Sequence, residues 1–228
     1  MKKIIYTVMM IVAVVSLASC AKKESLGLTH ITYYPSLEVL GDASITVQKG
    51  LPYVDAGCKA TLQGEDVTSQ VTTTSNVNTA VSGVYSVSYS IANAEGFIKT
   101  ATRQVIVLDL TDPIEGFYTT LNVHTATSSK YDGPWQTLII KNANGTYYIT
   151  DFFGGWYAIG RNYGSKYAMT GNFSLSGSTV TLLNSYLSGW GDGLDGMDVG
   201  TYNAATGTFY WEVVYAGSMT FYVTMQKN

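Results

Sequence analysis

The sequence predicts an all-β protein. Tyr, Thr, Val, Ser and Gly are abundant whereas Leu, Glu, Lys and Arg are scarce, and this composition favours pleated strands and tight turns over helices. Short apolar runs are separated by Gly, Pro and Asn turn signals along most of the chain. Because 228 residues leave room for two domains with apolar cores, we expect two all-β domains in succession.

The first segment, residues 1–19, is predicted to be a signal peptide. Met1-Lys2-Lys3 forms a basic start, and the apolar stretch from Ile4 to Leu17 is too short to span a bilayer comfortably as a helix. The following Leu17-Ala18-Ser19-Cys20 resembles the lipobox of bacterial lipoproteins. This resemblance implies that Cys20 carries a lipid and that residues 20–30 form a tether. The alternatives are an ordinary secretory signal with an incidental cysteine and a transmembrane anchor.

The residues behind Cys20 bear on the location of the protein. Residue 22 is Lys rather than the Asp of inner-membrane lipoproteins, so the resemblance implies lipid anchoring at the outer membrane, with the periplasmic or cell-surface side left open. Lys22-Lys23-Glu24 partly matches the export signal of starch-utilisation-type envelope lipoproteins. Without Lys2 and Lys3, 11 of the 13 basic residues remain against 16 acidic ones, a charge of −5. We therefore expect no nucleic-acid partner.

A first group of strands is predicted between residues 31 and 110. From Tyr85 to Ile91, large apolar or aromatic residues alternate with serine, as in a strand with one packed and one wet face. Asn93-Ala94-Glu95-Gly96 supplies a turn, and the stretch from Phe97 to Leu108 returns as a long strand. These residues predict a β-hairpin.

Five segments of this region carry a family resemblance. They are Tyr53-Val54-Asp55-Ala56-Gly57, Val67-Thr68, the stretch from Gly83 to Tyr89, Ala94-Glu95-Gly96 and Arg103-Gln104-Val105-Ile106-Val107. Together they resemble the bacterial surface Ig-like domain, a type also found in a pesticidal crystal protein. The resemblance covers roughly residues 35–109 and implies an Ig-like β-sandwich that serves as a spacer or adhesion module without catalytic residues. Cys58 departs from the family pattern. With Cys20 lipidated, Cys58 has no disulfide partner, so we expect a small buried hydrophobe, with a reactive thiol as the alternative.

A second domain is predicted from residue 113 to residue 228, since Asp112-Pro113 disfavours continued regular structure. About eight strands follow in meander order, and Asn142-Ala143-Asn144-Gly145 and Ala216-Gly217-Ser218 mark two hairpins. We expect an antiparallel up-and-down β-barrel. Its early Gly-x-aromatic step and final hairpins resemble lipocalin-type barrels and the C-terminal domains of starch-utilisation-type lipoproteins.

The aromatic residues concentrate in the second domain, which contains all four Trp and 12 of the 18 Tyr. Strand packing explains most of them, but some lie in glycine-rich loops, where an exposed ring can stack on a sugar or on an apolar ligand. In the alternative interpretation, these loops fold back and plug one end of the barrel. The candidate contact residues are Trp156, Tyr157 and Trp190, with Asp151, Arg161 and Asn162 as polar neighbours.

Three carboxylates in one loop, those of Asp192, Asp195 and Asp198, are a weak calcium candidate. The loop lacks the Asp-x-Asp-x-Asp spacing of an EF-hand, and solvated turn acids are the alternative. No other cofactor is expected.

The sequence offers no catalytic constellation. It has two histidines, no Gly-x-Ser-x-Gly elbow and no His-rich metal spacing, so we expect a non-enzyme. We predict a cell-envelope lipoprotein that binds a glycan or another small ligand, with the Ig-like domain as a spacer. The alternative is a structural or protein-interaction lipoprotein with an envelope protein partner. A glycoside hydrolase that pairs Asp151 with Asp192 or Glu212 is a remote third hypothesis, because the sequence does not give the distances between these carboxylates.

Overall fold

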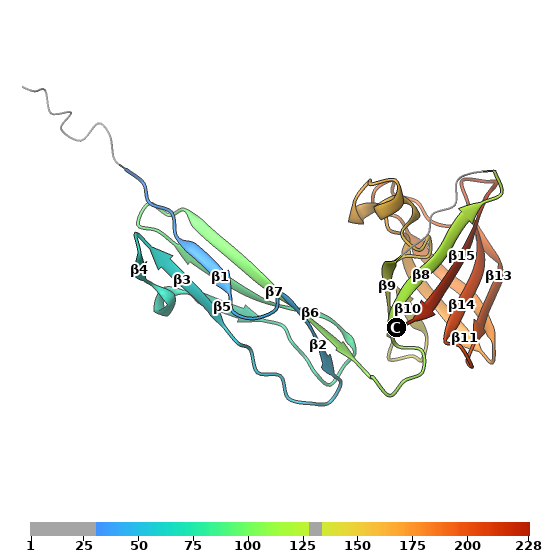
Figure 1. Ribbon diagram of the computed structural model, residues 1–228, viewed down its shortest axis with the longest axis horizontal. Helices are drawn as coiled ribbons and strands as arrows, with labels where there is room; N and C mark the ends of the chain where they lie inside the picture. Colours follow the sequence, from blue (N-terminus) through green and yellow to red (C-terminus); the bar gives the residue numbers. More distant parts are fainter. Residues whose placement is uncertain (1–30, 128–133) are drawn as a thin grey trace, which may run out of the picture.

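The computed structural model describes residues 31–127 and 134–228 and shows the predicted all-β protein. An elongated β-sandwich comes first in the chain and a closed β-barrel second, connected by the segment 109–115 (Figure 1). The predicted signal peptide and the predicted tether, with Cys20, lie outside the described residues. Within the described residues, no helix is long and apolar enough to cross a membrane.

The sandwich consists of two sheets. One contains β1 (Ser36–Val39), β3 (Cys58–Leu62) and β4 (Glu65–Asp66) in that order. The other has the order β2-β7-β6-β5, in which β2 (Ser44–Gln48) runs parallel to β7 (Ile98–Leu108) and the other pairs are antiparallel. The remaining strands of this sheet are β5 (Thr72–Ser75) and β6 (Gly83–Ala92), and a short 3-10 helix, η1 (Thr68–Gln70), precedes β5.

The predicted hairpin is confirmed as β6 and β7, which pair from Gly83↔Val107 to Ala92↔Ile98. The alternation along β6 has the expected result, because Val87, Tyr89 and Ile91 are buried in the sandwich core while the serines between them are partly exposed. Cys58 is a free, partly buried cysteine beside this core.

A buried ion pair lies inside the sandwich. Arg103, 2% exposed, donates to the carboxylate of Asp55 and to the backbone carbonyls of Leu40 and Asp42. The hydroxyls of Tyr53 and Tyr89 donate to the same carboxylate. Four of the residues that carry the family resemblance thus form one polar network, a role that the strand pattern alone does not predict. Such a network satisfies a guanidinium that would otherwise be costly to bury.

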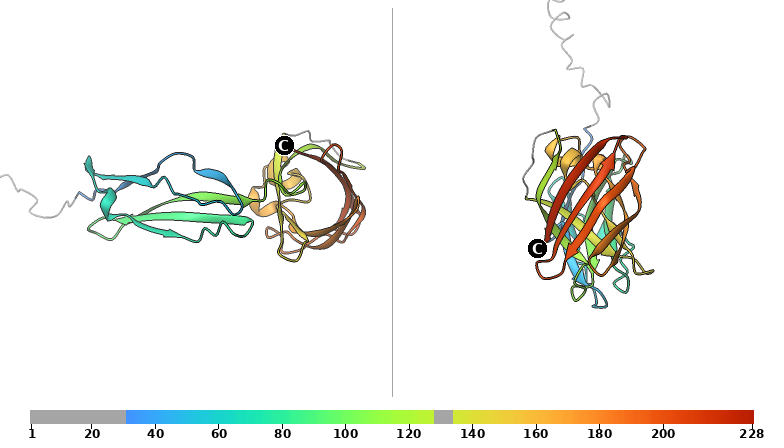
Figure 2. Two further views of the ribbon diagram at one scale, coloured as in Figure 1. Left: turned by 90° about the horizontal axis from the view of Figure 1, so that it is seen from below. Right: turned by 90° about the vertical axis from the view of Figure 1, so that its right-hand side faces the viewer.

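The second domain is the predicted eight-stranded up-and-down barrel. Strands β8 to β15 pair in chain order, and the pairing of β15 with β8 closes the ring (Figure 2). Both predicted turns connect neighbouring strands, β9 to β10 and β14 to β15. The strands are β8 (Gly116–Thr125), β9 (Trp135–Lys141), β10 (Tyr147–Ile149), β11 (Thr170–Ser176), β12 (Thr179–Tyr186), β13 (Gly196–Asn203), β14 (Thr208–Tyr215) and β15 (Met219–Lys227).

Large side chains fill the barrel interior. Phe209, Trp211 and Val213 of β14 are fully buried, as the alternation along this strand predicts, and Phe221 and Val223 of β15 lie beside them. Aromatic rings meet edge to face or tilted across the core. In the part of the barrel that the structure describes, the interior is therefore a packed core and not an open lipocalin-type ligand chamber.

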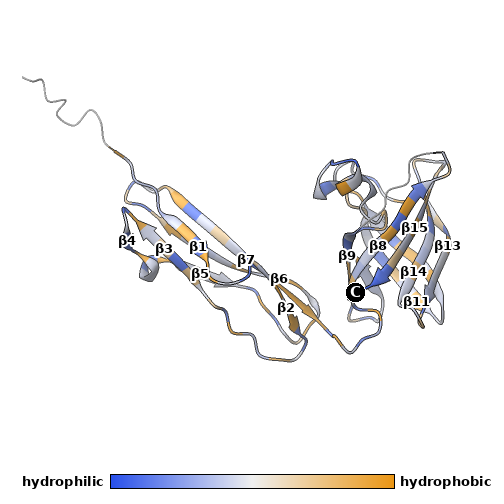
Figure 3. Ribbon diagram, in the orientation of Figure 1, coloured by the Kyte–Doolittle hydropathy of each residue, from blue (hydrophilic) through white to orange (hydrophobic). Residues whose placement is uncertain are grey.

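Apolar side chains from both domains form the junction between sandwich and barrel. Figure 3 shows the apolar character of β2 and of the end of β7 that approaches the barrel. The buried carboxylate of Glu115 accepts hydrogen bonds from the Ser82 hydroxyl (3.0 Å), the Asp109 amide (3.0 Å) and the Lys141 amide (3.3 Å). One side chain thus links β6 at its start, the connecting segment and β9. The apolar residues of the junction are Ile106, Leu108, Phe117, Leu138, Ile140 and Tyr148.

Candidate functional site

The segment between β10 and β11, residues 150–169, covers one end of the barrel. It contains a π-helical turn, η2 (Trp156–Gly160), and a 3-10 turn, η3 (Ser165–Tyr167), which Figure 1 shows in gold at the upper left of the barrel. Gly154 and Gly155 precede η2 with φ values of 56° and 90°. A side chain at Gly155 would come within 2.6 Å of the Trp135 ring, so glycine is required for this close approach.

Asp151 fastens this segment to the barrel. Its carboxylate accepts hydrogen bonds from the backbone amides of Phe153 (2.9 Å), Gly155 (2.8 Å) and Met169 (2.9 Å). The side chain is 6% exposed, and burial raises its pKa to about 6 although the three amides lower it. Asp151 therefore has a structural role, because it holds this segment on the barrel. Its buried position corrects the expectation that Asp151 lies at the surface beside a ligand.

The expected contact residue Trp156 is also placed differently. It is 2% exposed and packs edge to face on Phe221 in the core, because η2 directs it into the barrel end. The Arg161 guanidinium lies 5.5 Å from the Trp156 ring centroid and covers it from outside. Arg161 and Asn162 are exposed. Trp156 therefore agrees with the alternative interpretation of the sequence, in which the glycine-rich loops fold back and plug one end of the barrel.

An exposed group of rings lies beside the plug, and we call Tyr163, Tyr167, Trp190 and the adjacent Lys166 the aromatic surface. Trp190 is 45% exposed and Tyr163 is 49% exposed. The Tyr167 ring lies 4.9 Å from Trp190 and 5.4 Å from Tyr163, centroid to centroid. These four residues line a shallow hollow of about 480 Å³. The rings present apolar faces and the lysine a positive charge at one place on the molecule.

Two features hold the aromatic surface in place. Tyr157 lies beneath it and contacts Trp190 edge to face at 4.9 Å. The loop that carries Trp190 is hydrogen-bonded to η3, since the Gly189 amide and the Ser188 hydroxyl both donate to the Lys166 carbonyl. A side chain at Gly189 would come within 2.5 Å of the Tyr167 ring. The rings are thus preorganised by packing and by glycine at a tight contact.

The sequence pattern indicated Trp190 and Tyr157 but missed Tyr163, Lys166 and Tyr167. The signal that could have found them is the run from Tyr163 to Tyr167, two tyrosines around glycine, serine and lysine directly after the glycine-rich stretch. The structure brings Trp190 and Tyr157 together with these residues, and it leaves Trp156 and Asp151 inside the protein.

The three carboxylates of the predicted calcium loop lie in different surroundings. Asp192 accepts a hydrogen bond from the Tyr215 hydroxyl (2.9 Å), and Asp195 accepts one from the Gly217 amide (2.7 Å). Asp198 lies in β13 at a register shift. Among the residues that the structure describes, no group of three or more His, Cys, Asp or Glu side chains is arranged to hold a metal.

The carboxylates considered for glycoside hydrolysis occupy separate environments. Asp151 is buried and saturated with backbone hydrogen bonds, whereas Glu212 accepts from the Tyr210 hydroxyl at 2.6 Å. Burial, together with this hydrogen bond, raises the pKa of Tyr210 to about 12. The two carboxylates of a glycosidase must flank the glycosidic bond of the substrate, and the buried Asp151 carboxylate does not reach such a bond.

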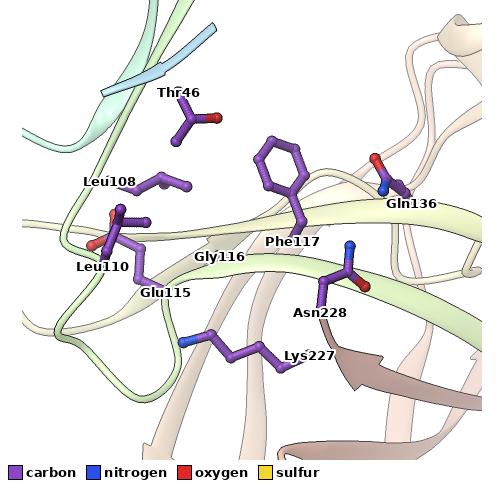
Figure 4. Close-up of a pocket in the computed structure, with 9 residues that line it drawn as sticks. All are labelled: Thr46, Leu108, Leu110, Glu115, Gly116, Phe117, Gln136, Lys227 and Asn228. Atoms are coloured by element: carbon purple, nitrogen blue, oxygen red, sulfur yellow. The ribbon is translucent and has the colours of Figure 1, made fainter. Parts of the chain in front are cut away.

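A second hollow lies at the domain junction. It has a volume of about 450 Å³, and Figure 4 shows Thr46, Leu108 and Phe117 around it from β2, β7 and β8. The Lys227 ammonium group lies at its edge and donates to the Asp112 carbonyl (2.8 Å). This hollow belongs to the junction that Glu115 holds together.

Comparisons with known proteins match both domains. The family model of the bacterial surface protein Ig-like domain matches residues 37–107, and a family model for a C-terminal domain matches residues 108–227. The crystal structure of the lipoprotein BT2262 from Bacteroides thetaiotaomicron is 38% identical and has a TM-score of 0.72, covering 85% of this chain and 100% of that chain. Neither family model describes an enzyme.

Two further solved structures are from Clostridium perfringens ZmpB. One contains CBM51-2 in complex with GlcNAc and INT domains, at 16% identity and a TM-score of 0.27 over 48% of this chain and 30% of that chain. The other contains the M60 catalytic domain with CBM51-1 and CBM51-2, at 15% identity and a TM-score of 0.29 over 53% and 15%. No curated protein matches the chain significantly.

Proposed function

Because the chain belongs to the family of lipoproteins that includes BT2262 of Bacteroides thetaiotaomicron, we propose that it is a non-catalytic, lipid-anchored envelope protein that binds a glycan at its aromatic surface. The lipid is on Cys20, and the membrane is the outer membrane. The Ig-like domain is a spacer between the lipid and the barrel.

The observation that carries the proposal is the exposure of Trp190 and Tyr163, beside the partly buried Tyr167, around one hollow. A flat ring offers an apolar face to the C–H groups of a sugar, and a ring already held in place loses little entropy on binding. Lys166 and the exposed Arg161 and Asn162 lie in the same segment and can donate hydrogen bonds to sugar hydroxyls. The filled barrel core directs the proposal to this outer surface and away from the interior.

Intrinsic fluorescence gives a direct test, because all four tryptophans belong to the barrel and Trp190 is the exposed one. Residues 21–228 are screened on a glycan array, and each hit is titrated while tryptophan emission is recorded. We expect saturable binding with a change in emission. Trp190→Phe should retain binding but lose most of the emission change.

Two alanine variants locate the site. Trp190→Ala and Tyr163→Ala should each weaken the affinity roughly tenfold, the magnitude of one aromatic contact. Tyr34→Ala is the matched control, since Tyr34 is an exposed ring in the Ig-like domain. Unchanged affinity in both alanine variants would remove the aromatic surface from the proposal. If no glycan binds to folded protein, the packed interior favours the alternative of a structural or protein-interaction lipoprotein.

A further inference from the structure

The barrel wall is open between β12 and β13. Among the described residues of these two strands, only Thr179 and Thr201 form a ladder pair, supported by a hydrogen bond from the Tyr202 amide to the Ser178 carbonyl (2.8 Å). At the other end, the connecting loop is closed by a hydrogen bond from the Leu187 amide to the Asp192 carbonyl (2.7 Å). Next to this end, the Leu194 amide also donates a hydrogen bond to the Ser185 hydroxyl (2.8 Å). The strand edges separate between residues 181 and 184 of β12 and form a cleft of about 610 Å³.

Two bulges cause this separation. The register between β11 and β12 shifts so that Leu183 has no counterpart, and the register between β13 and β14 skips Asp198. A bulge bends its strand and increases the local twist, so bulges in both walls turn the strands apart. At the narrow end, a side chain on Gly200 would come within 2.5 Å of the Val180 carbonyl oxygen, so glycine permits the approach there.

The cleft has an apolar floor and an acidic rim. Leu182, Leu194 and Met197 on its floor pack against the barrel core. Exposed Asp195 and Asp198 lie on the rim, and neither a basic side chain nor an aromatic ring is among the residues that line the cleft. The chemistry of this site therefore differs from that of the aromatic surface. Its polar lining is completed by Thr179, Thr181, Asn184 and Ser185.

We propose that the cleft between β12 and β13 binds an extended, positively charged peptide segment of a partner protein. Strand edges supply backbone donors and acceptors to an added strand, and alternate side chains of that strand would reach the apolar floor and the acidic rim. A sugar is a poorer occupant, since the cleft offers it no ring to stack on. The open stretch 181–184 corresponds to roughly 13 Å of strand, enough for about four peptide residues.

The test uses residues 21–228 and a labelled, end-blocked six-residue peptide that alternates lysine and valine. The same peptide with glutamate in place of lysine is the control probe. At low salt, we expect the fluorescence anisotropy of the lysine peptide to rise to a plateau as protein is added. The anisotropy of the glutamate peptide should not change. Hydrogen exchange should slow at amides within 180–185 and 194–200. Absence of binding, equal binding of both peptides, or protection confined to other segments would overturn the proposal.

Charge variants complete the test. Asp195→Asn keeps an acceptor for the Gly217 amide, and Asp198→Asn removes only a rim charge, so neither threatens the fold. Each should weaken binding of the lysine peptide about threefold. Glu212→Gln, which removes a carboxylate of β14 outside the cleft, is the matched control and should bind normally. Trp190→Ala should bind the peptide normally, which separates this proposal from the glycan proposal.

Discussion

Replacing Asp151 by asparagine is expected to remove a pH dependence from the stability of the barrel. Burial raises the pKa of this carboxyl from 3.8 to about 6, so ionising it costs about 3 kcal/mol more in the folded than in the unfolded protein. Between pH 3.8 and 6 the folded state holds more protons than the unfolded state. The free energy of unfolding that this group contributes is therefore fully present below pH 3.8 and lost as the pH rises through 6.

The asparagine side chain of the Asp151→Asn variant cannot ionise, and it keeps a carbonyl oxygen for the amides of Phe153 and Met169. Its amide nitrogen would face the Gly155 amide, so one hydrogen bond worth about 1 kcal/mol is lost. Near pH 4, we expect the free energies of unfolding of the parent and the variant to differ by no more than about 1 kcal/mol. At pH 8 the variant should be more stable by about 2 kcal/mol, the relief of the buried charge less the lost bond.

The assay is urea unfolding followed by tryptophan emission between pH 4 and pH 8. Every tryptophan lies in the barrel, so this signal reports unfolding of that domain. The same decline in stability with rising pH in both proteins would refute this account of Asp151. A variant that is less stable at every pH would show that the three amide bonds outweigh the cost of the buried charge.

Three further outcomes are expected. Asp55→Ala should destabilise the Ig-like domain by about 3–5 kcal/mol in calorimetry, because it leaves the buried Arg103 without its carboxylate. Burial alone would raise the pKa of Asp55, but its hydrogen bonds bring it to about 2, so its contribution to stability should persist above pH 4 and be lost as the pH falls towards 2. Cys20→Ser should release the protein from membranes in cell fractionation. Glu115→Ala, which leaves the Ser82 hydroxyl and the Asp109 amide without their acceptor, should speed proteolysis within 109–115, with Glu212→Ala, a partly buried carboxylate away from the junction, as the control.

Sequence reasoning predicted the strands of this protein well because alternation is a local signal. The faces of β6, β14 and β15 follow directly from the side-chain period of a strand, and the two barrel hairpins follow from their turn residues. The same reasoning predicted that aromatic residues beyond the strands would gather in loops. It did not decide which rings would be buried, because that depends on how the segment 150–169 folds over the barrel end.

Glycine is the physical reason that Trp156 and Trp190 have opposite environments in similar sequence contexts. Gly154 and Gly155 adopt positive φ before Trp156, and the resulting turn directs that ring into the core. Gly189 instead lets the loop before Trp190 lie against Tyr167, which leaves the indole at the surface. Glycines near a tryptophan therefore indicate that the chain passes close to other atoms there. Whether the tryptophan ring is buried or exposed depends on the tertiary structure.

Buried charges are the other feature that strand patterns do not locate. Arg103 falls in a strand between the polar residues Thr102 and Gln104, and Glu115 falls in the connecting segment, where the pattern predicts solvent-exposed charge. Both are buried because their partners converge from distant parts of the chain: Asp55 and Leu40 for Arg103, and Ser82 and Lys141 for Glu115. A buried charge is tolerated only where such partners meet. Arg103 and Glu115 therefore lie where distant parts of the chain must come together correctly. The cleft between β12 and β13 lies far from either point in sequence, so the barrel can leave it open without exposing a buried charge.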